Sequence, residues 1–123
     1  MSFQSEKTII VDNIERSTMS QKDIIEELKQ QLEQNFPDLI RNVVLFGSQV
    51  NGNYHSGSDY DVLIVTAHPI DWQLDDLISQ VCYEVMLEHD IFIDYKTIAE
   101  SELQTIKGSQ PFIIDALKTG IIL

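Results

Sequence analysis

Apolar residues recur at helical spacing in two stretches of the chain, and a capping signal precedes each stretch. Ser20 and Asp23 form a capping-box pattern before the first stretch. Asp71 is a suitable N-cap residue for the second stretch. We therefore predict two amphipathic helices, over residues 20–36 and 72–88, whose apolar sides cover a sheet.

Three apolar runs have the length and composition of strands: Val43–Phe46, the run from Asp59 to Thr66, and Ile91–Tyr95. The connection between the first two runs is short, so these strands are expected to pair antiparallel. A strand–helix–strand connection favours a parallel third strand beside the second. The pattern predicts an α/β (or α+β) fold, a small mixed sheet flanked by helices, with the helices packed on one face.

The ends of the chain carry weaker signals. Residues 100–106 predict a weak helix, and Pro111 lies in the first turn of a further helix that ends at Gly120. The last three residues form an apolar tail. Residues 1–17 show no firm periodicity, and we interpret residues 1–19 as an N-terminal arm of unknown role. Residues 20–123 are expected to form a single domain.

Composition narrows the possible partners and location. The 123 residues carry a formal net charge of −12, which argues against a nucleic-acid backbone as a direct ligand. The same charge predicts a basic face on a protein partner and association that weakens with salt. Cys82 is the one cysteine, so an internal disulfide is impossible, and we expect it to be a small buried residue. Without a signal-peptide pattern or an apolar run of membrane-spanning length, a cytoplasmic location is expected.

Candidate chemistry lies between the first two predicted strands and on the third. Gly47 would let the backbone approach a phosphate closely, and Ser48 with the following amides would favour anions. Asp59 and Asp61 are two residues apart on a strand, so both point to one face. Antiparallel pairing brings Gly47 and Ser48 beside these two carboxylates. Asp94 interrupts the third apolar run, and a metal ion shared with the pair would compensate its charge.

Few cations accompany this site in the sequence. The stretch from Asn42 to Tyr95 contains no lysine or arginine. A phosphate site there must rely on metal ions and backbone amides, or else use Arg41, Lys96 or a partner chain. We interpret Lys96 as a solvated residue beyond the strand end, with phosphate contact as the alternative. Asp90 is a rival to Asp94 as third ligand, although its position indicates a turn.

The combination of Gly47-Ser48, ten residues, Asp59-x-Asp61 and a later strand aspartate at Asp94 resembles the nucleotidyltransferase superfamily of DNA polymerase beta and kanamycin nucleotidyltransferase. The chain is most similar to the minimal, single-domain (MNT) members, which act as antitoxin partners of HEPN-domain proteins. The resemblance covers roughly residues 20–123, and it implies the fold of a polymerase-beta-type nucleotidyltransferase.

The resemblance also implies a set of roles. Asp59, Asp61 and Asp94 would be catalytic residues that hold two Mg²⁺ ions, with Asp94 also positioning or deprotonating the attacking hydroxyl. Gly47 and Ser48 would bind the phosphates of a nucleoside triphosphate. ATP would be the substrate, and AMP would pass to a tyrosine of a HEPN-type helical partner, which silences a toxin.

Two alternatives remain beside this interpretation. The chain could be an antitoxin or regulatory subunit with a vestigial site that inhibits its partner by contact. It could also be a small-molecule nucleotidyltransferase, which would need a second subunit because the chain is too short for a helical substrate domain. A homo- or hetero-oligomer is compatible with each.

Overall fold

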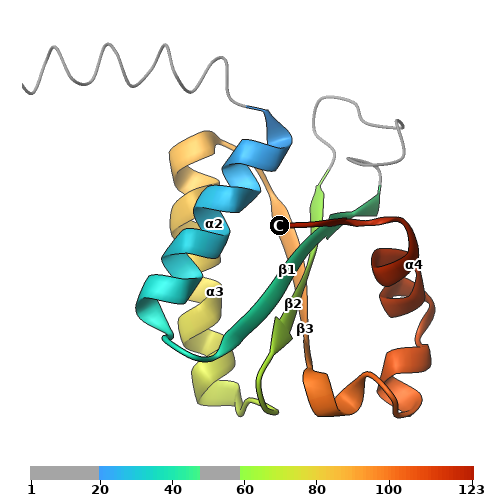
Figure 1. Ribbon diagram of the computed structural model, residues 1–123. Helices are drawn as coiled ribbons and strands as arrows, with labels where there is room; N and C mark the ends of the chain where they lie inside the picture. Colours follow the sequence, from blue (N-terminus) through green and yellow to red (C-terminus); the bar gives the residue numbers. More distant parts are fainter. Residues whose placement is uncertain (1–19, 48–58) are drawn as a thin grey trace, which may run out of the picture.

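The computed structural model describes residues 20–47 and 59–123. The part of the chain that it describes contains three α-helices, four strands and two short 3₁₀ helices (Figure 1). In chain order these are α2 (Gln21–Asn35), β1 (Ile40–Phe46), β2 (Tyr60–Thr66), α3 (Trp72–His89), β3 (Ile93–Ala99), η2 (Glu100–Glu102), η3 (Ile106–Ser109), α4 (Pro111–Thr119) and β4 (Ile121–Ile122).

The four strands form one mixed sheet in the order β3-β2-β1-β4. β1 pairs antiparallel with both β2 and β4, whereas β2 and β3 pair in parallel. The predicted antiparallel and parallel pairings are therefore both confirmed. The α3 crossover between β2 and β3 gives the parallel pair the long connection that it requires.

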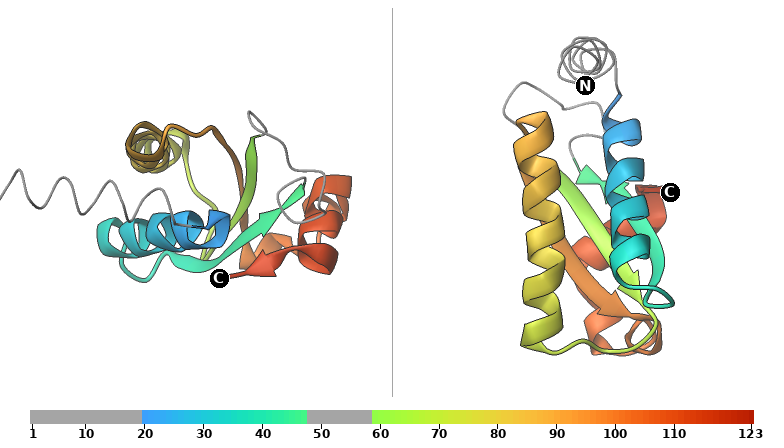
Figure 2. Two further views of the ribbon diagram at one scale, coloured as in Figure 1. Left: turned by 90° about the horizontal axis from the view of Figure 1, so that it is seen from above. Right: turned by 90° about the vertical axis from the view of Figure 1, so that its left-hand side faces the viewer.

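The sheet is covered on both faces. α2 and α3 lie side by side over one face, and α4 lies against the other (Figures 1 and 2). The predicted α/β fold of a small mixed sheet flanked by helices is confirmed, but the expectation that the helices share one face was wrong. After β3 the chain passes to the opposite side, where α4 buries Ile113 and Ala116 against the sheet.

Local capping signals place the first helices as predicted. The Ser20 hydroxyl accepts a hydrogen bond from the amide of Asp23 at 3.1 Å, and the Asp23 carboxylate accepts one from the Ser20 amide. Asp71 caps α3 by accepting from the amide of Leu74 at 2.8 Å. Cys82, on the inner side of α3, is fully buried as expected, and burial raises its pKa to about 12.

The later part of the chain departs from the predictions. β3 begins at Ile93 and continues to Ala99, so Lys96 lies within the strand and not beyond its end. Residues 100–106 form no α-helix; η2 occupies Glu100–Glu102. The apolar tail is a short strand, because Ile121–Ile122 pairs with β1. Gly120 ends α4 as predicted, with an extended backbone conformation.

Two predictions lie outside the described residues, namely the arm at 1–19 and the role of Ser48. Within the described ranges, none of the helices combines the length and the apolar character that crossing a membrane requires.

Candidate functional site

The site residues gather where β1 ends and β2 and β3 begin. Asp61 is the register partner of Phe46 on β1 and of Asp94 on β3. Neighbouring strands lie about 4.8 Å apart, so register partners project their side chains from the same face next to each other. Asp61 and Asp94 therefore face the same side of the sheet, the side that α4 covers farther along the strands.

Gly47 directly follows β1 and lies against Asp61. Its φ is +77°, in the left-handed region that L side chains rarely adopt. A Cβ built at this position would overlap the Asp61 Oδ2 atom and would lie 3.0 Å from Asp61 Cγ. Glycine at this position is therefore required twice, by the backbone conformation and by the close approach of the carboxylate.

The carboxylates perturb one another. Burial raises the pKa of Asp61, and the negative charges of Asp94, Asp59 and Asp115 raise it further. Asp115 comes from α4, so the acidic character of the site extends beyond the sheet. Lys96 acts in the opposite direction and lowers the pKa of Asp61. Ionised oxygens held together in this way provide an environment that a cation would stabilise.

Lys96 is the cation that the strands bring to this site. Its Nζ lies 3.3 Å from Asp94 Oδ1 and 5.4 Å from the centroid of the Phe112 ring. Arg41, the other cation that the sequence suggested, lies at the opposite end of β1 and donates to Glu100 Oε1 at 2.9 Å.

Three of the five predicted site residues are thus close together: Gly47, Asp61 and Asp94. Asp59 lies exposed just before β2, and its charge acts on Asp61. Ser48 is outside the described residues. The rival ligand Asp90 is the left-handed C-cap of α3, with φ 54°, in agreement with the turn that its position indicated.

Sequence reasoning missed Asp115 and Phe112. Both lie on α4, a helix expected on the other face, and no local pattern signals which face a terminal helix will cover. Lys96 was interpreted as a solvated residue in place of a phosphate ligand, because its strand was expected to end one residue before it, whereas β3 continues beyond it.

The donor set of the site suits a hard divalent cation. Asp59, Asp61 and Asp94 offer carboxylate oxygens, which Mg²⁺ prefers over nitrogen or sulfur ligands. Burial and the repulsion of the neighbouring carboxylates raise the pKa of Asp61, and a divalent ion would relieve the repulsion. These residues therefore fit the group that the family resemblance implies.

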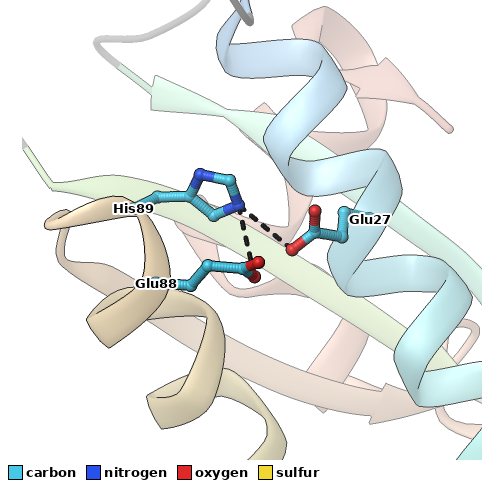
Figure 3. A group of neighbouring side chains, drawn as sticks. All are labelled: Glu27, Glu88 and His89. Carbon is cyan, nitrogen blue, oxygen red and sulfur yellow. Dashed lines mark hydrogen bonds and ion pairs between the residues drawn. The ribbon is translucent and has the colours of Figure 1, made fainter. Parts of the chain in front are cut away.

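A second group of potential ligands joins α2 to α3. Glu27, Glu88 and His89 place one ligand atom each within 4.8 Å of one another. The His89 side chain is 3% exposed, and its Nε2 lies 3.0 Å from Glu27 Oε2 and 3.5 Å from Glu88 Oε2 (Figure 3). The buried His89 Nε2 atom thus has a carboxylate partner on α2 and another on α3, and the group forms an inter-helix contact.

Comparison with known proteins gives the site a context. A family model described as a nucleotidyltransferase domain matches residues 25–121. A protein of Methanocaldococcus jannaschii, provisionally named a protein adenylyltransferase, is 31% identical over 106 residues, which are 85% of this chain and 99% of that protein.

Solved structures share the fold. A chain from the crystal structure of a toxin–antitoxin with AMP-PNP superimposes with a TM-score of 0.56 at 20% identity, covering 83% of this chain and 71% of that one. A chain from the complex of a tri-AMPylated Shewanella oneidensis HEPN toxin with an MNT antitoxin gives a TM-score of 0.52 at 17% identity, with 85% and 71% covered. At these identities the likeness concerns the fold alone.

Proposed function

We propose that this chain, which belongs to the nucleotidyltransferase domain family, transfers AMP from ATP to a hydroxyl group of a partner protein. The chain is a nucleotidyltransferase; the nucleotide, the metal and the acceptor are the parts that we propose. The relative from Methanocaldococcus jannaschii, named for protein adenylylation, spans nearly the same length and supports a protein as the acceptor.

One observation carries this proposal. Asp61 and Asp94 are register partners on β2 and β3, and Gly47 with φ +77° leaves room for the Asp61 carboxylate. Paired carboxylates beside a glycine-ended strand are what a metal-bound triphosphate needs, because the metal neutralises both the carboxylates and the phosphates. A purely structural sheet end would gain nothing from two adjacent acids.

The chemistry is a displacement at the α-phosphorus of ATP. The acceptor hydroxyl oxygen forms a bond to that phosphorus, the bond from phosphorus to the α–β bridging oxygen breaks, and pyrophosphate leaves. We assign to the Asp94 carboxylate the proton released by the acceptor hydroxyl. Gly47 is proposed to face the leaving phosphates, and Ser48, outside the described residues, would assist it through its hydroxyl and amide.

Asp59, Asp61 and Asp94 are the residues proposed to hold Mg²⁺, as a two-ion site. When bound, Mg²⁺ would supply charge stabilisation to the attacking and leaving oxygens. The chain's own contribution is to hold Asp61 and Asp94 on adjacent, paired strands, with Asp59 just before β2 and the buried core of the sheet behind them.

We propose a HEPN-type helical protein as the partner, with a tyrosine as the modified group, so that this chain would act as an antitoxin. The fold matches chains from toxin–antitoxin structures, one of which contains an AMPylated HEPN toxin. The net charge of −12 favours a basic face on the partner. Association of the two proteins should therefore weaken as the salt concentration rises.

Intact-mass spectrometry of the partner tests the proposal. The purified product of a HEPN-type gene adjacent to the gene of this chain is incubated with this protein, ATP and Mg²⁺. Parallel reactions contain the Asp59→Asn, Asp61→Asn double variant, or EDTA in place of Mg²⁺. The proposal expects a mass gain of one or more AMP units in the complete reaction alone.

The other outcomes identify the alternatives. A partner that gains no mass but co-purifies and is still inhibited would overturn the transfer and support inhibition by contact. Absence of both mass gain and complex would overturn the protein acceptor and direct the search to small-molecule hydroxyls. Equal gain with the double variant would contradict the carboxylate site.

A further inference from the structure

We propose that Lys96 is the phosphate-binding cation that the site itself supplies: its ammonium group neutralises Asp94 when no metal is bound and contacts the triphosphate of the metal-bound nucleotide. This inference rests on the proposed function and assigns a residue to it. The observation behind it is the placement of Lys96 on β3, two residues after Asp94 and on the same face.

The need for such a cation follows from the charges in the sequence. A triphosphate brings several negative charges to a site that already contains Asp59, Asp61 and Asp94, and the stretch from Asn42 to Tyr95 contains no lysine or arginine. Arg41 is excluded because it lies at the far end of β1 and is paired with Glu100. Of the two cations that flank the stretch, Lys96 is the one at the site.

The surroundings of Lys96 hold its side chain at the site without burying its charge. The ammonium group lies 3.3 Å from Asp94 Oδ1 and faces the ring of Phe112, with 5.4 Å between Nζ and the ring centroid. Phe112 belongs to the first turn of α4, so the lysine bridges the sheet and that helix. The Lys96 side chain remains 42% exposed, which leaves its ammonium free to change partner.

Competition for Asp94 provides the reason for the change of partner. A metal ion coordinated by Asp94 would interact with the same carboxylate as the Lys96 ammonium group. The two positive charges would therefore repel each other. The exposed side chain of Lys96 can then turn toward phosphate oxygens, which lysine binds as a compact point charge. Removal of the ammonium group should therefore weaken nucleotide binding without weakening metal binding.

The test compares Lys96→Met with Lys107→Met by isothermal titration calorimetry. Both variants remove one positive charge, but Lys107 lies on η3 and is paired with Glu102 at 2.7 Å. Each protein is titrated first with MgCl₂ alone, and then with an ATP analogue carrying a methylene bridge between the α- and β-phosphates in the presence of Mg²⁺. This analogue cannot release pyrophosphate, so the readout is independent of transfer.

For Lys96→Met we expect Mg²⁺ binding unchanged or up to about fivefold tighter and analogue binding weaker by about tenfold or more. Lys96→Arg should retain most of the analogue affinity, and Lys107→Met should match the wild type in both titrations. Analogue binding by Lys96→Met that equals the wild type would overturn the assignment. Parallel loss of metal and analogue affinity would also overturn it, because it indicates a structural role.

The design separates the inference from its premise. If the wild-type protein binds neither Mg²⁺ nor the analogue, the proposed function fails together with the inference. If the wild type binds both and Lys96→Met behaves in the same way, the proposed function stands and the role of Lys96 alone is contradicted.

Discussion

The two faces of β2 carry different side chains at the end of the strand where the candidate site lies. On one face, Tyr60, Val62 and Ile64 are buried beneath α2 and α3 in the larger apolar cluster. On the other face, Leu63 and Val65 pack beneath α4, but the first β2 residue on that face is Asp61. The side chains of β2 alternate between the two faces and form a core on both, but only the face beneath α4 begins with a carboxylate.

The comparison shows how the sheet can position repelling charges. The face beneath α2 and α3 buries the larger apolar cluster and anchors the strands, so the register that sets Asp61 opposite Asp94 does not depend on the carboxylates. Repulsion between the carboxylates of the acidic face can then destabilise the metal-free fold, and a bound cation would remove that repulsion. Substitutions at neighbouring positions of one strand should therefore have different consequences.

Asp61→Asn should have the largest effect on transfer. The amide has the same shape but lacks the charge needed to hold a cation, so we expect AMP transfer to fall by at least about a hundredfold. Transfer is measured from the mass of the acceptor, and circular dichroism verifies the fold. Undiminished transfer by this variant would contradict the assignment of Asp61.

Ile64→Ala, three positions along β2, should show the opposite pattern. Ile64 is fully buried beneath α2 and α3, so truncation should lower the free energy of unfolding by about 2–5 kcal/mol. Urea denaturation measures this loss. The affinity of the folded variant for Mg²⁺ should match that of the wild type, and a large loss of affinity would show that the two faces are not independent.

Gly47→Ala should damage both stability and the site. The φ of +77° disfavours any L residue by about 1–2 kcal/mol, and the added methyl group would displace the Asp61 carboxylate. Gly120→Ala is the matched control, because the nearest neighbours of its methyl group would be Ala116 O and Val44 Cγ1 and not a carboxylate. Both variants should melt at lower temperature, but only Gly47→Ala should weaken Mg²⁺ binding; equal affinities would contradict the close approach at Gly47.

Tyr95→Phe should have the smallest effect. Tyr95 follows Asp94 on β3 but packs against the α2 and α3 side, and its hydroxyl donates to Asp75 Oδ1 at 3.1 Å. Loss of this hydrogen bond should cost about 0.5–1.5 kcal/mol of stability, measured by urea denaturation, with transfer unchanged. A variant with normal stability and impaired transfer would place Tyr95 in the site after all.

Local signals in the sequence predicted the helix starts and the parity of the site residues. The capping box at Ser20 and the N-cap at Asp71 act within three or four residues, so they can be read without tertiary structure. The spacing of Asp59 and Asp61, and the placement of Asp94 on another strand, also follow from local patterns.

Long-range pairing determined the parts that were missed. Lys96–Ala99 carry a mixed polar pattern, and they remain a strand because they pair with residues 63–66 of β2. Ile121 and Ile122 form β4 only because the middle of β1 offers them a partner. The face covered by α4, and with it the contribution of Asp115 to the site, depends on the path of the chain after β3.

The pH dependence of stability follows from the raised pKa of Asp61. The folded protein holds the Asp61 proton more tightly than the unfolded chain does, so this group stabilises the fold below its ordinary pKa of 3.8. That contribution is lost as the pH rises through the raised value. At neutral pH, the metal-free fold should therefore gain stability when Asp61 is replaced by asparagine.

Thermal unfolding of the wild type and Asp61→Asn at pH 7, first in EDTA and then in MgCl₂, tests the central claim most directly. If the acidic face is the metal site, Asp61→Asn should melt at the higher temperature in EDTA, and Mg²⁺ should raise the midpoint of the wild type far more than that of the variant. An equal rise in both proteins, or none in the wild type, would contradict a metal site at Asp61 and Asp94.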